Sequence, residues 1–460
     1  MEFPLCDPDL LTYARLYPFQ RSHHQRMLSR LEQYFGFSEH GTSWRTEILA
    51  GLTTFITMAY IIFVNPAILS ETGMPIAAVT AATCLCAAFG SVLMGALANY
   101  PLALAPGMGL NAYFTYTVVK GMHVPWQTAL GAVFLSGVIF LLLTFTGVRQ
   151  LLVAAIPHQL HAAVAGGIGI FIAFIGFRNA GIIVPNPATT VALGNLRAPT
   201  TALALFGLIL IAVLQTLRVR AAMLIGVLGT MLAGVLFGQV HWHPEPYHFA
   251  ALRETAFRLD IPGALHIGAA EIVFVFLFVD LFDNIGTLVA VADRAKLTTA
   301  DHRIPRLNRI FFADAASTVV GSLTGTSTVT SYIESSAGVA AGGRTGVTAI
   351  VTGLLFAVAL FVAPLIGAIP SFATSPALIL VGGLMLTGLG QIEWTDPAIA
   401  IPAFLTVTTI PMTWSIADGL SFGLTSYAAL ELLTGRARRS SWMLYLLAAL
   451  FLLRFFLLRH

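Results

Sequence analysis

Two aspartates lie near the middle of a stretch, residues 271–292, that is otherwise apolar and long enough to cross a bilayer. A carboxylate at that depth costs about 2.5–3.5 kcal/mol on insertion scales. Asp280 and Asp283 are three residues apart, so a helix would project them from nearly the same face, where both can meet one ligand, one cation or one proton path. A structural network with another helix is the alternative. Acidic groups inside a membrane favour a transporter.

Two further stretches predict interrupted membrane helices. Residues 99–108 read NYPLALAPGM, in which Pro101 and Pro106 exclude a continuous helix, and residues 321–330 read GSLTGTSTVT, which favours extended chain. About ten helical residues follow each of them. Non-helical backbone at membrane depth is tolerated only where protein or a cavity satisfies it, so a pair of interruptions indicates a binding site near the midplane.

Polar residues beside these interruptions are candidates for that site. Glu334 opens the second short helix, where the helix dipole stabilises a carboxylate that can still accept from a ligand, and simple capping is its alternative. Asn111 carries a mixed donor and acceptor amide suited to a heterocycle edge, and a helix-to-helix hydrogen bond is its alternative. Ser331 lies in the same polar segment as Glu334, and Thr57 belongs to a polar stripe that either packs or contacts a ligand. Asp314 is a candidate for a proton path, although pairing with a polar group of the first half suits it better.

The composition defines the class. Of 460 residues, 57% are hydrophobic and 10% are charged, against about 25% charged in soluble domains, and the mean hydropathy is +0.84. The chain is therefore a polytopic membrane protein, and a net charge of +3 is too small and dispersed for nucleic-acid binding. Cys84 and Cys86 point apart on a helix and are packing residues. The histidines at 241, 243, 248 and 266 have mixed spacing, so no metal site is expected there. A cofactor and a catalytic group are not expected either.

Windows of about 20 apolar residues predict about seven helices in each half. The predicted helices are 47–69, 77–98, 110–119, 128–147, 161–177, 201–217, 221–238, 269–292, 309–323, 331–340, 347–366, 377–389, 398–413 and 416–433. An odd number in each half orients the halves oppositely, and Lys and Arg fall in alternate loops, which predicts cytoplasmic ends for the bundle. The last apolar run, 442–458, contains Arg454 and is interpreted as a helix in the interface rather than a crossing.

Four motifs carry a family resemblance. They are LEQYFGFSEHGTSWRTEILAGLTTFITMAYIIFVNP from Leu31, ALAPGMGLNAYF from Ala103, FVFLFVDLFDNIGTLVAVA from Phe274 and TSTVTSYIESSAGVAAGGRTGVTA from Thr326. In this order they resemble the AzgA-like purine permeases, a branch of the nucleobase:cation symporter-2 family in the nucleobase/ascorbate transporter superfamily. The likeness runs from Leu31 to about Leu458.

The resemblance implies an all-α polytopic membrane protein with fourteen transmembrane segments in two inverted seven-span repeats. Short extended strands precede half-helices in spans 3 and 10, and core and gate domains alternate along the chain. The implied parts are a cytoplasmic tail (1–43), the first core half (44–147), the first gate half (148–240), an extracytoplasmic loop (241–268), the second core half (269–367), the second gate half (368–434) and a basic linker with a C-terminal apolar helix (435–460). It also implies proton-coupled uptake of guanine, hypoxanthine or adenine across the plasma (inner) membrane by a homodimer, with the proton gradient as driving force and no cofactor.

The resemblance also implies roles for individual residues, which are assigned by their positions in the four motifs. Asp283 and Glu334 match the acidic substrate positions, Thr287 the polar position one turn later, and Asp280 an acidic position of this branch. Met108 and Gly109 supply backbone at the first strand-to-helix junction. The coupled proton is expected on one of Asp280, Asp283, Glu334 or Asp314. In the xanthine and uric acid branch, the span-10 motif begins with a Gln or Glu that is followed by Asn and Gly. Here Ser335 and Ser336 follow Glu334, so the side-chain geometry is expected to differ from that branch.

Two other classes of function stay open. The same fold could serve another small substrate, such as xanthine, uracil or an organic or inorganic anion, although an anion site would favour Arg or Lys at the binding point. An intramembrane hydrolase is disfavoured because two aspartates on one helix do not form the usual two-helix dyad.

Overall fold

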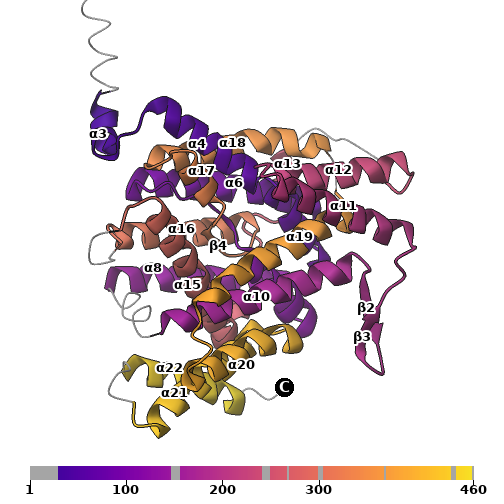
Figure 1. Cartoon of the computed structure of the whole chain (residues 1–460), viewed down its shortest axis with the longest axis vertical. Coiled ribbons are helices and arrows are strands. Elements are labelled where there is room, and N and C mark those ends of the chain that lie inside the picture. The colour runs from indigo at the N-terminus through magenta and orange to yellow at the C-terminus, as the bar shows by residue number, and fades with distance from the viewer. Residues whose placement is uncertain are drawn as a thin grey trace, which may run out of the picture.

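The computed structural model describes residues 29–146, 156–240, 249–266, 269–298, 304–366, 369–436 and 442–457. These residues form a bundle of helices with two small two-stranded sheets (Figure 1). Within the described segments, seven helical stretches are long and apolar enough to cross a membrane: Trp44–Thr72, Ile76–Ala98, Trp126–Thr146, His158–Asn179, Pro199–Thr216, Ile272–Arg294 and Ser371–Gln391. Shorter apolar helices cover Ala222–Leu236, Gly346–Val362, Pro397–Thr413 and Trp442–Leu453.

The elements of the first half follow the predicted order. They are α3 (Phe37–His40), α4 (Trp44–Met58), α5 (Ile61–Leu69), η1 (Ser70–Thr72), α6 (Ile76–Leu93), η2 (Met94–Ala98), β1 (Leu104–Pro106), α7 (Met108–Ala112), η3 (Tyr113–Gly121), α8 (Trp126–Thr146), α10 (His158–Asn179), β2 (Ile183–Asn186), β3 (Thr190–Leu193), α11 (Pro199–Thr216) and α12 (Ala222–Leu236).

The second half repeats the pattern of two helices, a strand with a short helix, and another helix. Its elements are α13 (Phe249–Leu252), α14 (Ile261–His266), α15 (Ala269–Arg294), α16 (Leu307–Thr324), β4 (Val329–Ser331), α17 (Ser335–Ala340), α18 (Gly346–Ile366), α19 (Ser371–Met385), η4 (Leu386–Gln391), α20 (Pro397–Thr413), α21 (Ile416–Leu433) and α22 (Trp442–Leu457).

The structure differs from the sequence expectations at four places. The helix predicted at 331–340 begins only at Ser335, because Ser331 still belongs to β4 and a turn follows it. Residues 321–324 are helical, because α16 continues to Thr324 and ends at Gly325, whose left-handed φ of 103° lets its N–H bond back to the Gly321 carbonyl. The antiparallel pair β2–β3 was not foreseen and projects from the bundle after α10 (Figure 1). The loop expected at 241–268 contains the short helices α13 and α14.

Several expectations lie outside the described residues. They concern most of the N-terminal tail (1–28), the boundaries at 147/148 and 367/368, the histidines at 241, 243 and 248, and the basic linker at 437–441.

Strand β1 from the first half pairs with β4 from the second half. The two strands are antiparallel, with Leu104 opposite Ser331 and Pro106 opposite Val329. The pairing extends on one side, where the Gly107 N–H donates to the Thr328 carbonyl at 2.9 Å. A Cβ at Gly107 would lie 2.9 Å from the Thr330 side chain, so this close approach requires glycine. The two halves of the chain are thus joined by main-chain hydrogen bonds at the centre of the bundle.

The backbone of each strand, β1 and β4, forms hydrogen bonds with a hydroxyl group of a helix beside it, and the arrangement is the same in both halves. Ser91 of α6 donates to the Leu104 carbonyl at 3.1 Å and accepts from its N–H at 3.0 Å. Thr318 of α16 does the same for Val329, donating to its carbonyl at 3.1 Å and accepting from its N–H at 3.2 Å. Each half therefore uses one hydroxyl to stabilise its own strand, as buried polar backbone requires.

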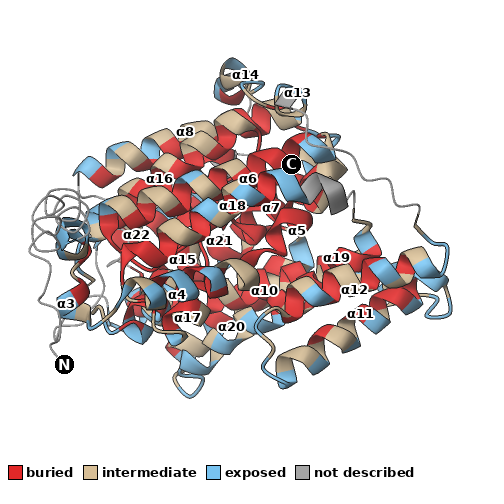
Figure 2. Cartoon of the chain, turned by 90° about the horizontal axis from the view of Figure 1, so that it is seen from above, coloured by how far each residue is buried: buried red, intermediate tan, exposed pale blue. Residues whose placement is uncertain are grey.

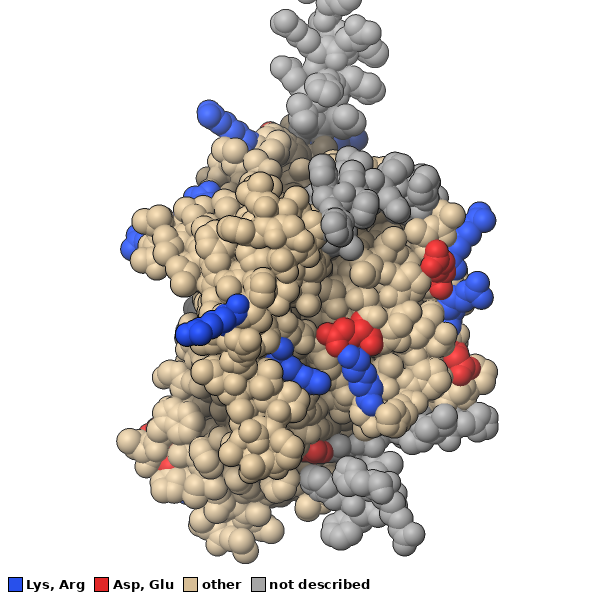
Figure 3. Space-filling model, turned by 90° about the vertical axis from the view of Figure 1, so that its right-hand side faces the viewer, with Lys and Arg blue, Asp and Glu red and all other residues tan. Residues whose placement is uncertain are grey.

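The outer helices present apolar side chains to their surroundings. Buried residues are concentrated in helices such as α5, α6 and α7, whereas α11 and α20 at the edge of the bundle are more exposed (Figure 2). Leu236 and Leu433 are 76% and 82% exposed. One face of the molecule is mostly uncharged, with scattered Lys, Arg, Asp and Glu side chains (Figure 3). Such a surface suits lipid rather than water.

The last helix, α22, packs one face against the bundle. Phe451 is fully buried, and its ring lies 4.9 Å from that of Phe274 and 5.7 Å from that of Phe278, both in α15. Its other face exposes Trp442 and Leu446.

Candidate functional site

A cavity of about 540 Å³ lies between α10, α15, the β4–α17 segment and the α19–η4 helix. Polar residues converge on an otherwise apolar wall, as is usual for small-molecule sites. The lining residues are Met108, His158, His161, Ala162, Ala165, Phe282, Asp283, Ile285, Gly286, Thr287, Val289, Ala290, Asp293, Thr330, Ser331, Tyr332, Ile333, Glu334, Val381, Leu384, Met385, Thr387, Gly388 and Gln391.

Two carboxylates from different elements face this cavity. Asp283 comes from α15, and the Thr330 side chain lies within hydrogen-bonding reach of it. Glu334 immediately precedes α17, and its Oε1 accepts a hydrogen bond of 2.6 Å from the Tyr60 hydroxyl. Tyr60 stands at the break between α4 and α5, which turns its side chain toward the second half of the chain. Glu334 is close enough to Asp283 for their charges to interact.

The cavity is open at one end. His158, Asp293, Thr387 and Gln391 line it and are exposed. Asp283 lies ten residues before Asp293 on α15, so its carboxylate is about 15 Å deeper along the helix. Tyr332 lies near the closed end, where its hydroxyl donates to the Pro106 carbonyl at 2.5 Å and its N–H donates to the Ala103 carbonyl at 3.0 Å.

Five predicted residues therefore meet at the cavity wall. They are Asp283, Glu334, Thr287, Met108 and Ser331. They come from α15, the β4–α17 segment and the start of α7, so the two strand-to-helix junctions and the acidic helix enclose one space.

The structure does not bring Asp280 and Asp314 to the cavity wall. Both side chains are fully buried, and Asp280 lies one turn farther from the open end of the cavity than Asp283 does. Asp314, on α16, is nevertheless close enough to interact electrostatically with Asp283. One ligand in this cavity would contact Asp283 directly and Asp280 only across a further helical turn.

Three other predicted residues serve contacts between or within helices. The Asn111 amide donates to Asn65 Oδ1 at 2.5 Å and accepts from Ser327, which is the helix-to-helix alternative considered for it. Gly109 packs against α10, where a Cβ would lie 2.6 Å from the Ile168 side chain. The Thr57 hydroxyl donates to the Thr53 carbonyl at 2.7 Å.

Sequence reasoning missed the contribution of α10 and α19 to the cavity. His161 lines it, is 7% exposed and packs against Phe282 in a tilted arrangement, with 4.8 Å between the ring centroids. An ionisable residue inside an apolar helix was the available signal for His161. Val381 and Met385 of α19 gave no such signal, because lining and lipid-facing apolar residues look alike in sequence.

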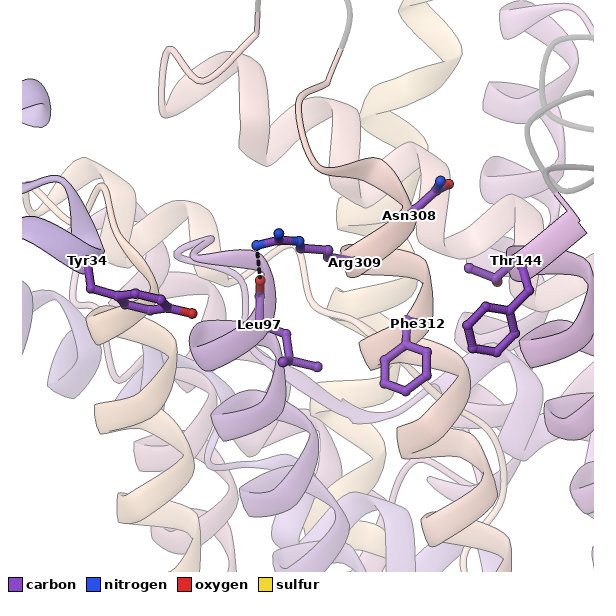
Figure 4. Close-up of a pocket in the computed structure, with 7 residues that line it drawn as sticks. Tyr34, Leu97, Thr144, Asn308, Arg309 and Phe312 are labelled. Atoms are coloured by element: carbon purple, nitrogen blue, oxygen red, sulfur yellow. Dashed lines mark hydrogen bonds between the residues drawn. The ribbon is translucent and has the colours of Figure 1, made fainter. Parts of the chain in front are cut away.

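A second cavity of about 510 Å³ lies at another place, between α6–η2, α8 and α16 (Figure 4). It is lined by Tyr34, Leu97, Thr144, Phe145, Asn308, Arg309 and Phe312. Arg309 donates to the Leu97 carbonyl at 3.4 Å across it. The described residues that line it include no carboxylate, so this cavity lacks the acidic acceptors of the first one.

Comparison with known proteins gives the class. A model described as a permease family matches residues 45–421. The chain is 44% identical over 424 residues to the adenine permease AdeP of Escherichia coli strain K12, covering 92% of this chain and 95% of that protein. It is 45% identical over 444 residues to the guanine/hypoxanthine permease PbuG of Bacillus subtilis strain 168, covering 93% and 100%. The chain therefore belongs to the permease family of nucleobase/ascorbate transporters, as its motifs predicted.

These relatives are transporters and not enzymes, and the chain is a multi-pass membrane protein. Among solved structures, the transmembrane domain of a cyanobacterium bicarbonate transporter, BicA, matches with a TM-score of 0.59 over 84% of this chain and 97% of that one, at 14% identity. That likeness establishes a BicA-type transporter fold and carries no information about substrate.

Proposed function

We propose that this protein imports purine nucleobases together with protons. The observation that carries the proposal is the placement of Asp283 and Glu334, from separate elements, on one largely apolar cavity. A neutral purine presents adjacent N–H donors and an apolar ring, and a carboxylate that accepts two parallel N–H donors forms short, charge-assisted bonds. The names of the adenine and guanine/hypoxanthine relatives support the same substrate class.

The acidic residues would also couple transport to protons. Two carboxylates in one cavity repel each other, so a proton on one of Asp280, Asp283, Glu334 or Asp314 would favour binding of a base that needs the other as acceptor. The described residues that line the cavity include no Lys or Arg to neutralise this charge. A proton that enters down a potential of 100 mV supplies about 2.3 kcal/mol, enough for roughly fifty-fold accumulation.

The proposed cycle uses fourteen spans in two inverted repeats, with a core domain that moves against a gate domain. The matching roles of Ser91 and Thr318 at β1 and β4 support the repeat, since each performs the same task in its own half. Arg294 is the last residue of α15 and Lys296 follows it, at the end where the cavity opens, and the positive-inside rule favours a cytoplasmic position for that end. The protein would then lie in the plasma membrane as a homodimer, with both ends of the bundle in the cytoplasm and the site open inward.

Another substrate on the same fold is the second candidate. An organic or inorganic anion would have to bind beside Asp283 and Glu334, which disfavours it. Xanthine and uracil share the N–H and carbonyl groups of the favoured purines, so the assay includes them.

The test is uptake of labelled hypoxanthine, guanine, adenine, xanthine and uracil by cells that express the protein and lack their own nucleobase permeases. Saturable purine uptake that collapses with a protonophore is the expected result. Uptake that survives the protonophore would reject proton coupling. No purine uptake by protein that is present in the membrane would reject the substrate class.

A further inference from the structure

One stripe of α10 lies against two very different environments. Its first part, with His158, His161 and Ala165, lines the cavity. At the helical spacing of three and four residues the same stripe continues through Ile168, Ile172, Ile175 and Asn179. The three isoleucines are at most 2% exposed, and Ile168 contacts Gly109 of α7. The path beside α10 is therefore open at one end and sealed by apolar packing beyond the cavity.

A polar cluster closes the far end of this stripe. The Asn179 amide donates to Glu71 Oε1 at 3.2 Å and to the Tyr116 hydroxyl at 3.3 Å, and that hydroxyl donates to Glu71 Oε1 at 2.7 Å. Lys120 pairs with the other oxygen of Glu71. Since α10 rises about 1.5 Å per residue, Asn179 lies about 30 Å from His158 at the open end. The cluster thus ties α10 to η1 and η3 at the end opposite the cavity mouth.

Trp414 makes a second connection at this end. It lies between α20 and α21 with a φ of 57°, a left-handed conformation that bulky residues rarely adopt. Its carbonyl accepts a hydrogen bond of 2.7 Å from Thr117 of η3. Its ring lies 5.1 Å from that of Phe174, and the Arg178 guanidinium lies 5.2 Å from its centroid. The α20–α21 connection therefore packs on the end of α10 and reaches η3 as well.

We propose that Glu71, Tyr116, Lys120, Asn179 and Trp414 form the closure of the site on the face opposite the cavity mouth, and that the Asn179 and Trp414 contacts to η1 and η3 must separate before the site opens there. The inference rests on the proposed function as a transporter with alternating access. The contacts join α10 and the α20–α21 connection on one side to η1 and η3 on the other, which are the parts assigned to gate and core.

The strength of the cluster suits repeated opening. The Lys120 and Glu71 side chains are 44% and 28% exposed, and ion pairs at such exposure contribute little to stability. The two hydrogen bonds of Asn179 are donated by its uncharged amide group, and each has a donor–acceptor distance of more than 3 Å. Water can replace the Asn179 bonds once α10 and η1–η3 part, while the ion pair stays on the η1–η3 side, so the cluster can hold the closed state without trapping the protein in it.

The experiment measures access to the sealed stripe directly. A cysteine placed by Ile175→Cys, one turn below Asn179, is allowed to react with a hydrophilic maleimide in protein held in lipid nanodiscs. All variants carry Cys6→Ser, and this protein without the reporter measures background labelling from Cys84 and Cys86, which are fully buried in α6. The reporter is combined with Asn179→Ala, Glu71→Gln or Lys120→Gln, and with Asn195→Ala as the matched control, because Asn195 lies in an exposed turn outside the cluster.

Slow labelling of the reporter alone and several-fold faster labelling with Asn179→Ala and Glu71→Gln are expected, with Asn195→Ala unchanged. Lys120→Gln alters a half-exposed side chain that holds Glu71 in place for Asn179, so it should also raise the labelling rate, and it serves if the other two variants do not fold. Rapid labelling of the reporter alone, or equal rates in all folded variants, would overturn the closure. Because labelling does not depend on purines, a protein that shows the expected labelling but transports no purine would reject the proposed substrate and leave the closure standing.

Discussion

The hydroxyl of Tyr60 donates a 2.6 Å hydrogen bond to Glu334, although 274 positions separate the two residues in the chain. Tyr60 occupies the break between α4 and α5, and Glu334 lies between β4 and α17. Each side chain is therefore presented by an interruption of regular structure. The bond fixes the direction of the Glu334 carboxylate from the opposite half of the protein.

Replacing Tyr60 with phenylalanine should weaken substrate binding without removing it. A hydrogen bond to a charged group contributes about 1.5–3 kcal/mol, so a loosely held Glu334 should raise the KM for purine uptake by roughly tenfold or more. The maximal rate should change less. Initial-rate uptake over a range of purine concentrations measures both, with Tyr445→Phe in α22 as the control. An unchanged KM would mean that the Tyr60 bond does not position Glu334 for substrate.

Asp283→Asn and Glu334→Gln should each reduce purine uptake by at least about a hundredfold, because each removes a charged acceptor for N–H donors at a buried site. The measurement is uptake of labelled purine, normalised to the amount of protein in the membrane. Asp396→Asn provides the control, because Asp396 is a partly exposed helix-capping residue outside the cavity. Retained proton-driven uptake in Asp283→Asn would remove Asp283 from the site.

Adjacent glycines in α19 should respond oppositely to alanine. A Cβ at Gly382 would collide with the Gly169 carbonyl of α10, whereas a Cβ at Gly383 would meet nothing within 4 Å. Gly382→Ala should therefore lower the free energy of unfolding by about 1–3 kcal/mol through overpacking. Gly383→Ala should be neutral or stabilising, since alanine favours a helix over glycine. Thermal unfolding of the purified variants separates the two effects, and equal melting temperatures would contradict the close approach of α10 and α19.

The cap of α20 should give a pH-dependent contribution to stability. The Ala398 N–H donates to Asp396, and Arg436 lies 3.0 Å from its other oxygen; these contacts, the backbone bond first, hold the pKa of Asp396 below its usual range. A lowered pKa means that the stabilisation is present above the unfolded-state value and is lost as the pH falls through the folded-state value. Asp396→Ala should melt at a lower temperature than the wild type near neutral pH. The difference should shrink in acid, and a constant difference from neutral to acidic pH would contradict this origin.

The helices could be predicted because a membrane requires long apolar segments, and each predicted run overlaps a helix of the structure. The β1 segment was also predictable, since Pro101 and Pro106 forbid a continuous helix. The end of α16 lies one residue beyond the predicted helix 309–323, whereas the extended segment predicted at 321–330 began too early. Gly321 and Ser322 weaken a helix without ending it, and the stop comes at Gly325, where the backbone turns left-handed. The pairing of β1 with β4 was not predictable, since no residue type encodes a partner in the other half.

Acidic positions of the site were predictable because a carboxylate in an apolar segment is conspicuous. The direction of a polar side chain was harder to predict. Asn111 has the donors and acceptors for a ligand, yet its amide joins Asn65 and Ser327. Asp280 and Asp283 lie on one helix, but only Asp283 reaches the cavity, because the space ends within one turn of it. Whether a residue on a helix reaches a cavity is therefore decided by the elements packed around that helix, which set where the cavity ends.

The pairing of β1 with β4 has a consequence for how the chain is made. When Leu104–Pro106 leave the ribosome, their strand partner has not yet been synthesised, because it follows about 220 residues later. At roughly 5–20 residues per second that interval is about 10–45 s. During this time the first half of the protein has part of its central backbone without its strand partner, so the centre of the protein cannot be completed until α15, α16 and β4 of the second half have been made.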